Sequence, residues 1–111
     1  MAAPTVADTG IDMNHPDFAG QIAHYQDFTG TGLADNDGHG SHVAGIVAAG
    51  RDGFGNHGAA FDARLAVTKV ADGSSYSFDM AREAAAWGRD LGSVSVNVSA
   101  AYLRDYALIA F

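Results

Sequence analysis

An aspartate and a histidine in this sequence stand where acid–base chemistry is feasible. Asp8 follows the apolar pair Val6-Ala7 and precedes Thr-Gly, and His39 stands between two glycines, 31 residues further on. A carboxylate in such a position has two chemical uses. It can share a site with a second carboxylate and activate water, or it can orient a histidine that accepts the proton of a nucleophile.

Zinc binding is a third use of this segment, because His39 and His42 are three residues apart. Helical zinc motifs with two histidines also contain a glutamate or a third ligand, and none accompanies these two. We therefore interpret His42 as a packed or hydrogen-bonded structural residue. Taken singly, an aspartate before Thr-Gly is typical of a turn, and a histidine at a helix start is typical of a capping or surface group.

The hydrophobic pattern predicts alternating strands and helices. Residues 64–70 are apolar enough for a strand covered on both faces. The other expected strands are residues 4–7, 21–28 and 93–99, the last with alternating valines. One expected helix runs from near His39 to Gly50 and has Val43, Ile46 and Val47 on one face. The second expected helix has Met80, Ala84, Trp87 and Leu91 at helical spacing. Asp79 is its expected cap and Gly92 its expected stop.

This order of elements predicts an α/β fold with a parallel sheet and functional residues at the carboxyl ends of its strands. Asp8 ends a strand and His39 opens a helix, so the fold can bring them together at one edge of the sheet. The aspartic proteases, which also carry Asp-Thr-Gly, consist almost entirely of β-structure. Two helices therefore argue against the paired-carboxylate chemistry.

Composition narrows the function classes. The 111 residues are enough for one small domain, with 48% apolar residues. Thirteen acidic and six basic side chains give a net charge of −7, and there is neither a basic face for nucleic acid nor an apolar stretch long enough for a bilayer. We expect no nucleic-acid partner and no membrane partner. The absence of cysteine leaves the redox compartment open.

Three segments carry a family resemblance. Residues 37–50, Asp-Gly-His-Gly-Ser-His-Val-Ala-Gly and onward, resemble the histidine motif of the subtilisin-like serine proteases, with Ser41 in place of the usual threonine. Residues 6–18 resemble the aspartate motif of that family, and residues 94–102 resemble the strand that ends in Ser-Leu-Gly and lines the substrate cleft. The three segments come in the family's order.

The resemblance implies a partial subtilisin-like three-layer α/β fold, with a mostly parallel sheet in the spatial order second, third, first and fourth strand. It implies that Asp8 orients His39 and that His39 is the general base, which requires a contact of about 2.6–3.2 Å. The implied substrate-binding residues are Ala71, Gly73, Ser99, Ala100 and Ala101. Ala101 stands where the family has glycine, so its methyl group would narrow the specificity pocket.

The family's nucleophile motif, Gly-Thr-Ser-Met-Ala, does not occur in these residues, and the oxyanion-hole asparagine of the family also falls beyond them. The seven serines all stand in other contexts. We therefore expect residues 1–111 to be a single truncated catalytic-domain fragment that is inactive alone. Its expected partners are a peptide or protein substrate and the missing C-terminal half or a second copy. The alternative is a non-catalytic remnant that binds peptides or a partner.

No cofactor is required by this chemistry, but the resemblance leaves a structural calcium ion open, with Asp17 and Asp52 as its ligands. The sequence Asp-Asn-Asp-Gly-His-Gly lacks EF-hand spacing, so we interpret Asp35 and Asp37 as solvated turn residues. The first residues lack the features of a secretory signal, and only the resemblance implies secretion.

Overall fold

The computed structural model describes residues 3–32, 34–51, 53, 57–72, 75–76, 78–93 and 95–98. Along the chain the elements are β1 (Thr5–Asp8), the 3₁₀ turn η1 (Pro16–Phe18), β2 (Ile22–Asp27), α1 (His39–Ala48), β3 (Leu65–Lys69), β4 (Ala71–Asp72), β5 (Ser75–Tyr76), α2 (Phe78–Asp90) and β6 (Val96–Val98). Four strands form one sheet, and β4 and β5 form a separate antiparallel pair. The fold is α/β, as expected.

The four-stranded sheet is parallel and has the order β2–β3–β1–β6. This order confirms the prediction of second, third, first and fourth strand. Every residue of the inner strands β1 and β3 is buried, which confirms that the segment around β3 is covered on both faces. The sheet places the carboxyl ends of β1 and β3 side by side, since Asp8 pairs with Lys69.

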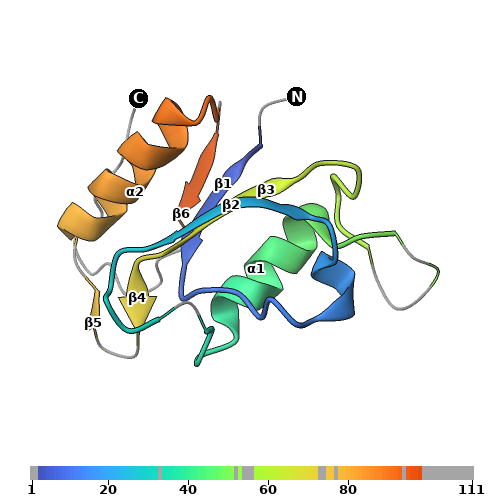
Figure 1. Ribbon diagram of the computed structural model, residues 1–111, viewed down its shortest axis with the longest axis horizontal. Coiled ribbons are helices and arrows are strands. Elements are labelled where there is room, and N and C mark those ends of the chain that lie inside the picture. Colours follow the sequence, from blue (N-terminus) through green and yellow to red (C-terminus); the bar gives the residue numbers. More distant parts are fainter. Residues whose placement is uncertain are drawn as a thin grey trace.

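The two helices pack on opposite faces of the sheet, because successive residues of a strand point to opposite sides. Val6 of β1 belongs to a core cluster with Ala44 and Ala48 of α1. Ala7, the next residue, belongs to a second cluster with Ala84 of α2. Figure 1 shows α1 and α2 on different sides of β1. The structure thus has the three layers of helix, sheet and helix that the resemblance implies.

α1 packs on the sheet through small residues. Its buried residues are Gly40, Ala44 and Ala48, spaced four apart, while Val43 and Val47 are partly buried against the same cluster. The expectation that Ile46 shares this face is wrong, because Ile46 is 60% exposed. Small residues occupy the contact because they let the helix approach β1 closely.

α2 begins at Phe78, so Asp79 lies in the first helical turn and is not the cap that the sequence suggested. The helix ends at Asp90, and the predicted stop residue Gly92, two positions further on, has a φ of 91°. The N–H groups of Gly92 and Ser93 donate to the carbonyls of Arg89 and Gly88, the pattern of a Schellman motif. Leu91, expected on the packed face, is 39% exposed instead.

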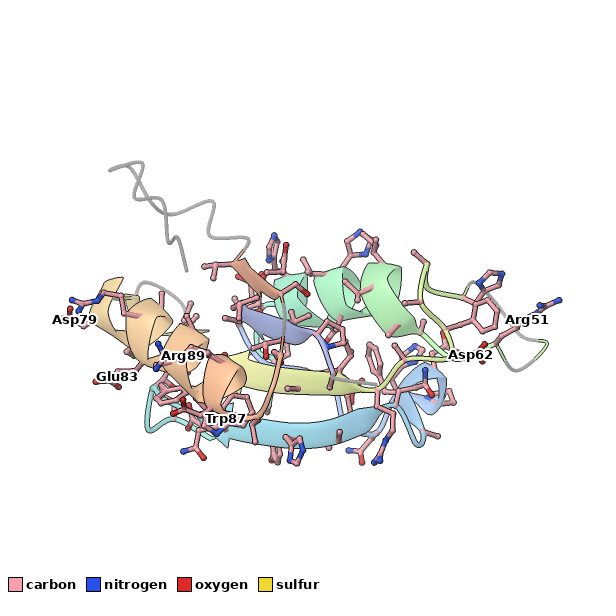
Figure 2. The ribbon with its side chains drawn as sticks, turned by 90° about the horizontal axis from the view of Figure 1, so that it is seen from above. Arg51, Asp62, Asp79, Glu83, Trp87 and Arg89 are labelled. Atoms are coloured by element: carbon pink, nitrogen blue, oxygen red, sulfur yellow. The ribbon has the colours of Figure 1, made fainter. Side chains whose placement is uncertain are left out.

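The outer face of α2 is polar. Asp79, Glu83 and Arg89 project away from the sheet (Figure 2), and the inner face consists of Ala81, Ala84, Ala85 and Gly88.

Within the described part of the chain, neither helix is long and apolar enough to cross a membrane.

Candidate active site

Asp8 ends the central strand β1, and its carboxylate is buried, with 3% of the side chain exposed. One oxygen, Oδ1, accepts a hydrogen bond from the Thr9 N–H at 2.8 Å and lies 2.7 Å from Nδ1 of His39. The other oxygen, Oδ2, has no hydrogen-bond partner among the described residues. The distance to His39 falls within the range that the sequence-based interpretation required.

His39 is the first residue of α1, and 36% of its side chain is exposed. The hydrogen bond to Asp8 and the charge of Asp8 raise the pKa of the His39 ring above its usual 6.5. Burial lowers this pKa, and the charges of Asp37 and Asp35 raise it further. An ionised carboxylate has no proton to donate, so Nδ1 is the donor in this bond. Nε2 of the neutral ring therefore keeps a lone pair and can accept a proton.

Two glycines flank His39 for different reasons. Gly38 has a φ of 93°, a conformation that residues with a side chain rarely adopt. Gly40 touches the chain just after β1, and a Cβ on Gly40 would collide with the carbonyl oxygen of Gly10. The absence of a side chain at Gly40 therefore allows the start of α1 to meet the chain just after β1.

Asp35 has a larger role than the sequence suggested. The interpretation of Asp35 as a solvated turn residue is wrong, because its half-buried carboxylate accepts hydrogen bonds from the N–H groups of Gly38, Ser41 and Asp37. Burial alone would raise the pKa of Asp35, but hydrogen bonds from Ser41, Gly38 and Thr9 lower it to about 2. A signal for this role was present: Gly38 caps α1 without a side-chain acceptor, so another residue has to supply one.

The expected substrate-binding residues are placed only in part. Ala71 is buried in β4, which pairs with β5. Gly73, Ser99, Ala100 and Ala101 lie outside the described residues. The role of these positions in binding a peptide stays a prediction.

The calcium prediction is likewise untested. Asp17 lies in η1, and its carboxylate is 3.8 Å from Nδ1 of His15. Asp52, the second expected ligand, lies outside the described residues. Among the residues that are described, no group of three or more His, Cys, Asp or Glu side chains is arranged to hold a metal ion.

His42 is exposed on the solvent side of α1, so it is not packed. The other interpretation, a hydrogen-bonded His42, stays a prediction. His42 lines a surface hollow of about 420 Å³ together with His15, Asp17, Ser41 and His57 and several apolar residues. Neither Asp8 nor His39 lines this hollow, so it is separate from the candidate active site.

A buried carboxylate on a parallel strand, hydrogen-bonded to a histidine at a helix start, is the arrangement expected of a serine protease with an Asp–His pair. Comparison with known proteins agrees with this class. The model of the Subtilase family matches residues 5–101, and the chain belongs to the subtilase family.

Individual relatives support the same assignment. The chain is 40% identical over 78 residues to the "Major intracellular serine protease" of Bacillus subtilis (strain 168). The aligned region covers 65% of this chain and 24% of that protein. The chain is 45% identical over 85 residues to "Subtilisin" of Bacillus sp. (strain TA39), covering 68% of this chain and 20% of that protein. The chain therefore spans about a quarter or less of these relatives. One of them is named as intracellular, so family membership alone does not decide location.

Proposed function

We propose that this chain is the N-terminal part of a subtilisin-like serine endopeptidase, in which Asp8 orients His39 and His39 is the general base for peptide-bond hydrolysis. The observation that carries the proposal is the 2.7 Å contact between Oδ1 of Asp8 and Nδ1 of His39. Membership of the subtilase family supports the same chemistry.

The roles follow from the chemistry of the pair. A serine hydroxyl becomes an effective nucleophile when a neutral imidazole accepts its proton. Asp8 fixes the ring tautomer with Nδ1 protonated, and its negative charge stabilises the imidazolium that forms after proton transfer. Because Asp8 raises the pKa of His39, the neutral base form accumulates at a higher pH than for an unperturbed histidine. Activity should therefore increase with pH through a midpoint above 6.5.

The nucleophilic serine comes from outside these 111 residues in this proposal, because none of the seven serines stands in a Gly-Thr-Ser-Met-Ala motif. A chain with the base but without the nucleophile and oxyanion donor loses most of the rate enhancement of such an enzyme. The 111-residue chain is therefore inactive alone. The substrate is an extended peptide, bound along the edge that contains β4.

The test is complementation. The purified 111-residue chain is mixed with a second polypeptide that contains the serine motif and the oxyanion asparagine of a subtilase, and hydrolysis of a fluorogenic peptide is measured. We expect no turnover from either chain alone and turnover from the mixture. His39→Ala should abolish this turnover, and Asp8→Asn should reduce it by about 10⁴-fold, because an asparagine does not hold the productive tautomer.

One control and two possible outcomes make the result decisive. His42→Ala is the matched histidine control and should retain activity, because His42 is exposed and lines a hollow that neither Asp8 nor His39 lines. Turnover by the 111-residue chain alone that requires His39 would contradict the proposed inactivity. Peptide binding without turnover in the mixture, unchanged in His39→Ala, would instead indicate a binding module.

A further inference from the structure

The carboxylate of Asp35 joins the two segments that carry the candidate catalytic residues. Asp35 lies in the loop between β2 and α1, and five donors surround its two oxygens. Three are N–H groups at or just before the start of α1. The other two are the hydroxyl groups of Thr9 and Ser41, at 2.7 Å each.

Each of these hydroxyl groups bridges the chain after β1 and the start of α1. The Thr9 hydroxyl accepts from the Gly40 N–H at 2.8 Å and donates to Oδ1 of Asp35. The Ser41 hydroxyl accepts from the Asp12 N–H at 2.9 Å and donates to Oδ2 of Asp35. A hydroxyl group has one proton. Asp35 therefore determines the direction of both bridges, because it accepts both protons.

These bridges lie next to the Asp8–His39 pair. Thr9 follows Asp8 and donates its N–H to Oδ1 of Asp8, the oxygen that also contacts His39. Gly40 follows His39 directly. A shift of either bridge would therefore move one member of the pair relative to the other.

The loop that carries Asp35 is itself fixed. Lys69 ends β3 beside Asp8, and its side chain is fully buried. Its Nζ donates to the carbonyl of Ala34 at 2.7 Å and lies 3.6 Å from Oδ2 of Asp72. The residue before Asp35 is thus attached to the central sheet, which limits the positions that the Asp35 carboxylate can take.

We propose that Asp35 is a positioning residue, which holds the chain after β1 against the start of α1 and thereby sets the Asp8–His39 hydrogen bond. The role of the pair in catalysis rests on the proposed function, whereas the geometric effect of Asp35 does not. Ser41 stands where the family motif has threonine, and both residues provide the hydroxyl group that this arrangement uses.

A control variant at Asp37 distinguishes an effect of Asp35 on geometry from an effect of its charge alone. Asp37 also places a negative charge near His39, and its carboxylate accepts from the His39 N–H at 3.3 Å. Asparagine at position 37 keeps an acceptor oxygen for that single bond. Asparagine at position 35 has one acceptor oxygen and an NH₂ group for five donors, so it cannot replace the carboxylate. The two variants remove equal charge but differ in their effect on geometry.

The experiment uses proton and ¹⁵N NMR of the 111-residue chain with uniform ¹⁵N labelling. The Nδ1 proton of His39 is identified as a downfield signal that disappears in Asp8→Asn. We expect Asp35→Asn to move this signal upfield or remove it and to speed its exchange with water by about tenfold or more. Asp37→Asn should keep the signal close to its wild-type position. Dispersed amide signals from β1 and β3 verify that each variant is folded.

Several outcomes would overturn the proposal. The downfield signal could persist unchanged in Asp35→Asn, or Asp37→Asn could weaken it equally, which would indicate an effect of charge alone. If Asp35→Asn does not fold, Ser41→Ala should weaken the signal and Ser41→Thr should preserve it. An unchanged signal in a folded Ser41→Ala variant would also contradict the proposal.

Activity measurements separate this proposal from the proposed function. In the complemented enzyme, Asp35→Asn should lower kcat by about tenfold or more with little change in KM, because a misplaced base impairs the chemical step. If complementation yields an active enzyme that Asp35→Asn leaves unchanged, positioning is refuted and the proposed function stands. If complementation fails while the NMR effect is present, the proposed function fails and positioning stands.

Discussion

The two helices are attached to the same central strand by different kinds of contact. α2 meets β1 through small side chains, with Ala84 beside Ala7 and Gly88 against Thr5. α1 also has a small-residue face, but its first turn is connected to the chain after β1 by polar bonds through Thr9 and Asp35. Apolar packing tolerates small shifts, whereas hydrogen bonds are sensitive to distance and angle. The helix that begins with the candidate base is the one with the polar connection.

The close contact at the start of α1 should give the largest effect. In Gly40→Ala the new Cβ would meet the backbone of Gly10 and Thr9, and backbone cannot move aside easily. We expect a loss of about 3 kcal/mol or more in the free energy of unfolding, measured by urea titration. Gly45→Ala is the matched control within α1. Its Cβ has ordinary contact with Phe18, so it should stabilise the helix by about 0.5–1 kcal/mol. Equal behaviour of the two variants would show that this contact is loose.

The corresponding contact of α2 should be less sensitive. In Gly88→Ala the new Cβ would meet the side chain of Thr5 and not the backbone. We expect a net loss of about 2 kcal/mol or less, because the cost of overpacking is partly offset by the better helix propensity of alanine. Adding Thr5→Ala should make the Gly88→Ala substitution less costly in a double-mutant cycle. A Gly88→Ala effect equal to that of Gly40→Ala would remove the distinction between the helices.

The sequence predicted the architecture better than the details of packing. Hydrophobic periodicity located both helices, and the family resemblance supplied the strand order and the Asp8–His39 pair. The buried face of α1 was partly misjudged, because bulky Ile46 was chosen over glycine and alanine. Periodicity identifies large apolar residues, but a helix close to a strand uses small ones.

Asp35 was missed for a different reason. Its contacts reach back to Thr9, 26 residues earlier, so no local motif defines them. A sequence shows which residues can accept hydrogen bonds but not which distant donors reach them. Lys69 illustrates the same limit. Its position in an apolar strand does not reveal that its ammonium group donates to the carbonyl of Ala34 and lies near the carboxylate of Asp72.

Acid should weaken the polar connection of α1. The folded pKa of Asp35, about 2, is below its ordinary 3.8, so the folded protein binds fewer protons than the unfolded chain. The stabilisation is therefore present above pH 4 and is lost as the pH falls from about 4 to about 2. Because the carboxylate is half-buried, solvent screening reduces its contribution to the free energy of unfolding to about 1–2 kcal/mol.

Urea unfolding at several pH values measures this effect. The stability difference between wild type and Asp35→Asn should shrink by that amount across the stated pH range. Glu83→Gln, on the exposed face of α2 (Figure 2), should instead follow the wild-type curve. If wild type and Asp35→Asn lost stability in parallel, the folded carboxylate would not be specially stabilised.

The smallest expected effect concerns two threonines on the α2 side of the sheet. Thr68 is completely buried in β3, and its hydroxyl has no hydrogen-bond partner among the described residues. The Thr5 hydroxyl lies 2.7 Å from Oγ of Ser93.

Thr68→Val replaces an unsatisfied hydroxyl group by a methyl group of similar volume, and valine favours the strand. This substitution should stabilise the protein by about 0.5–1 kcal/mol. Thr5→Val removes a formed hydrogen bond and should destabilise it by about 1 kcal/mol. Thermal unfolding of both variants measures the difference, and destabilisation by Thr68→Val would indicate that its hydroxyl has a partner. Opposite signs from the same substitution would show that the polar groups beneath α2 differ in hydrogen bonding and not in burial.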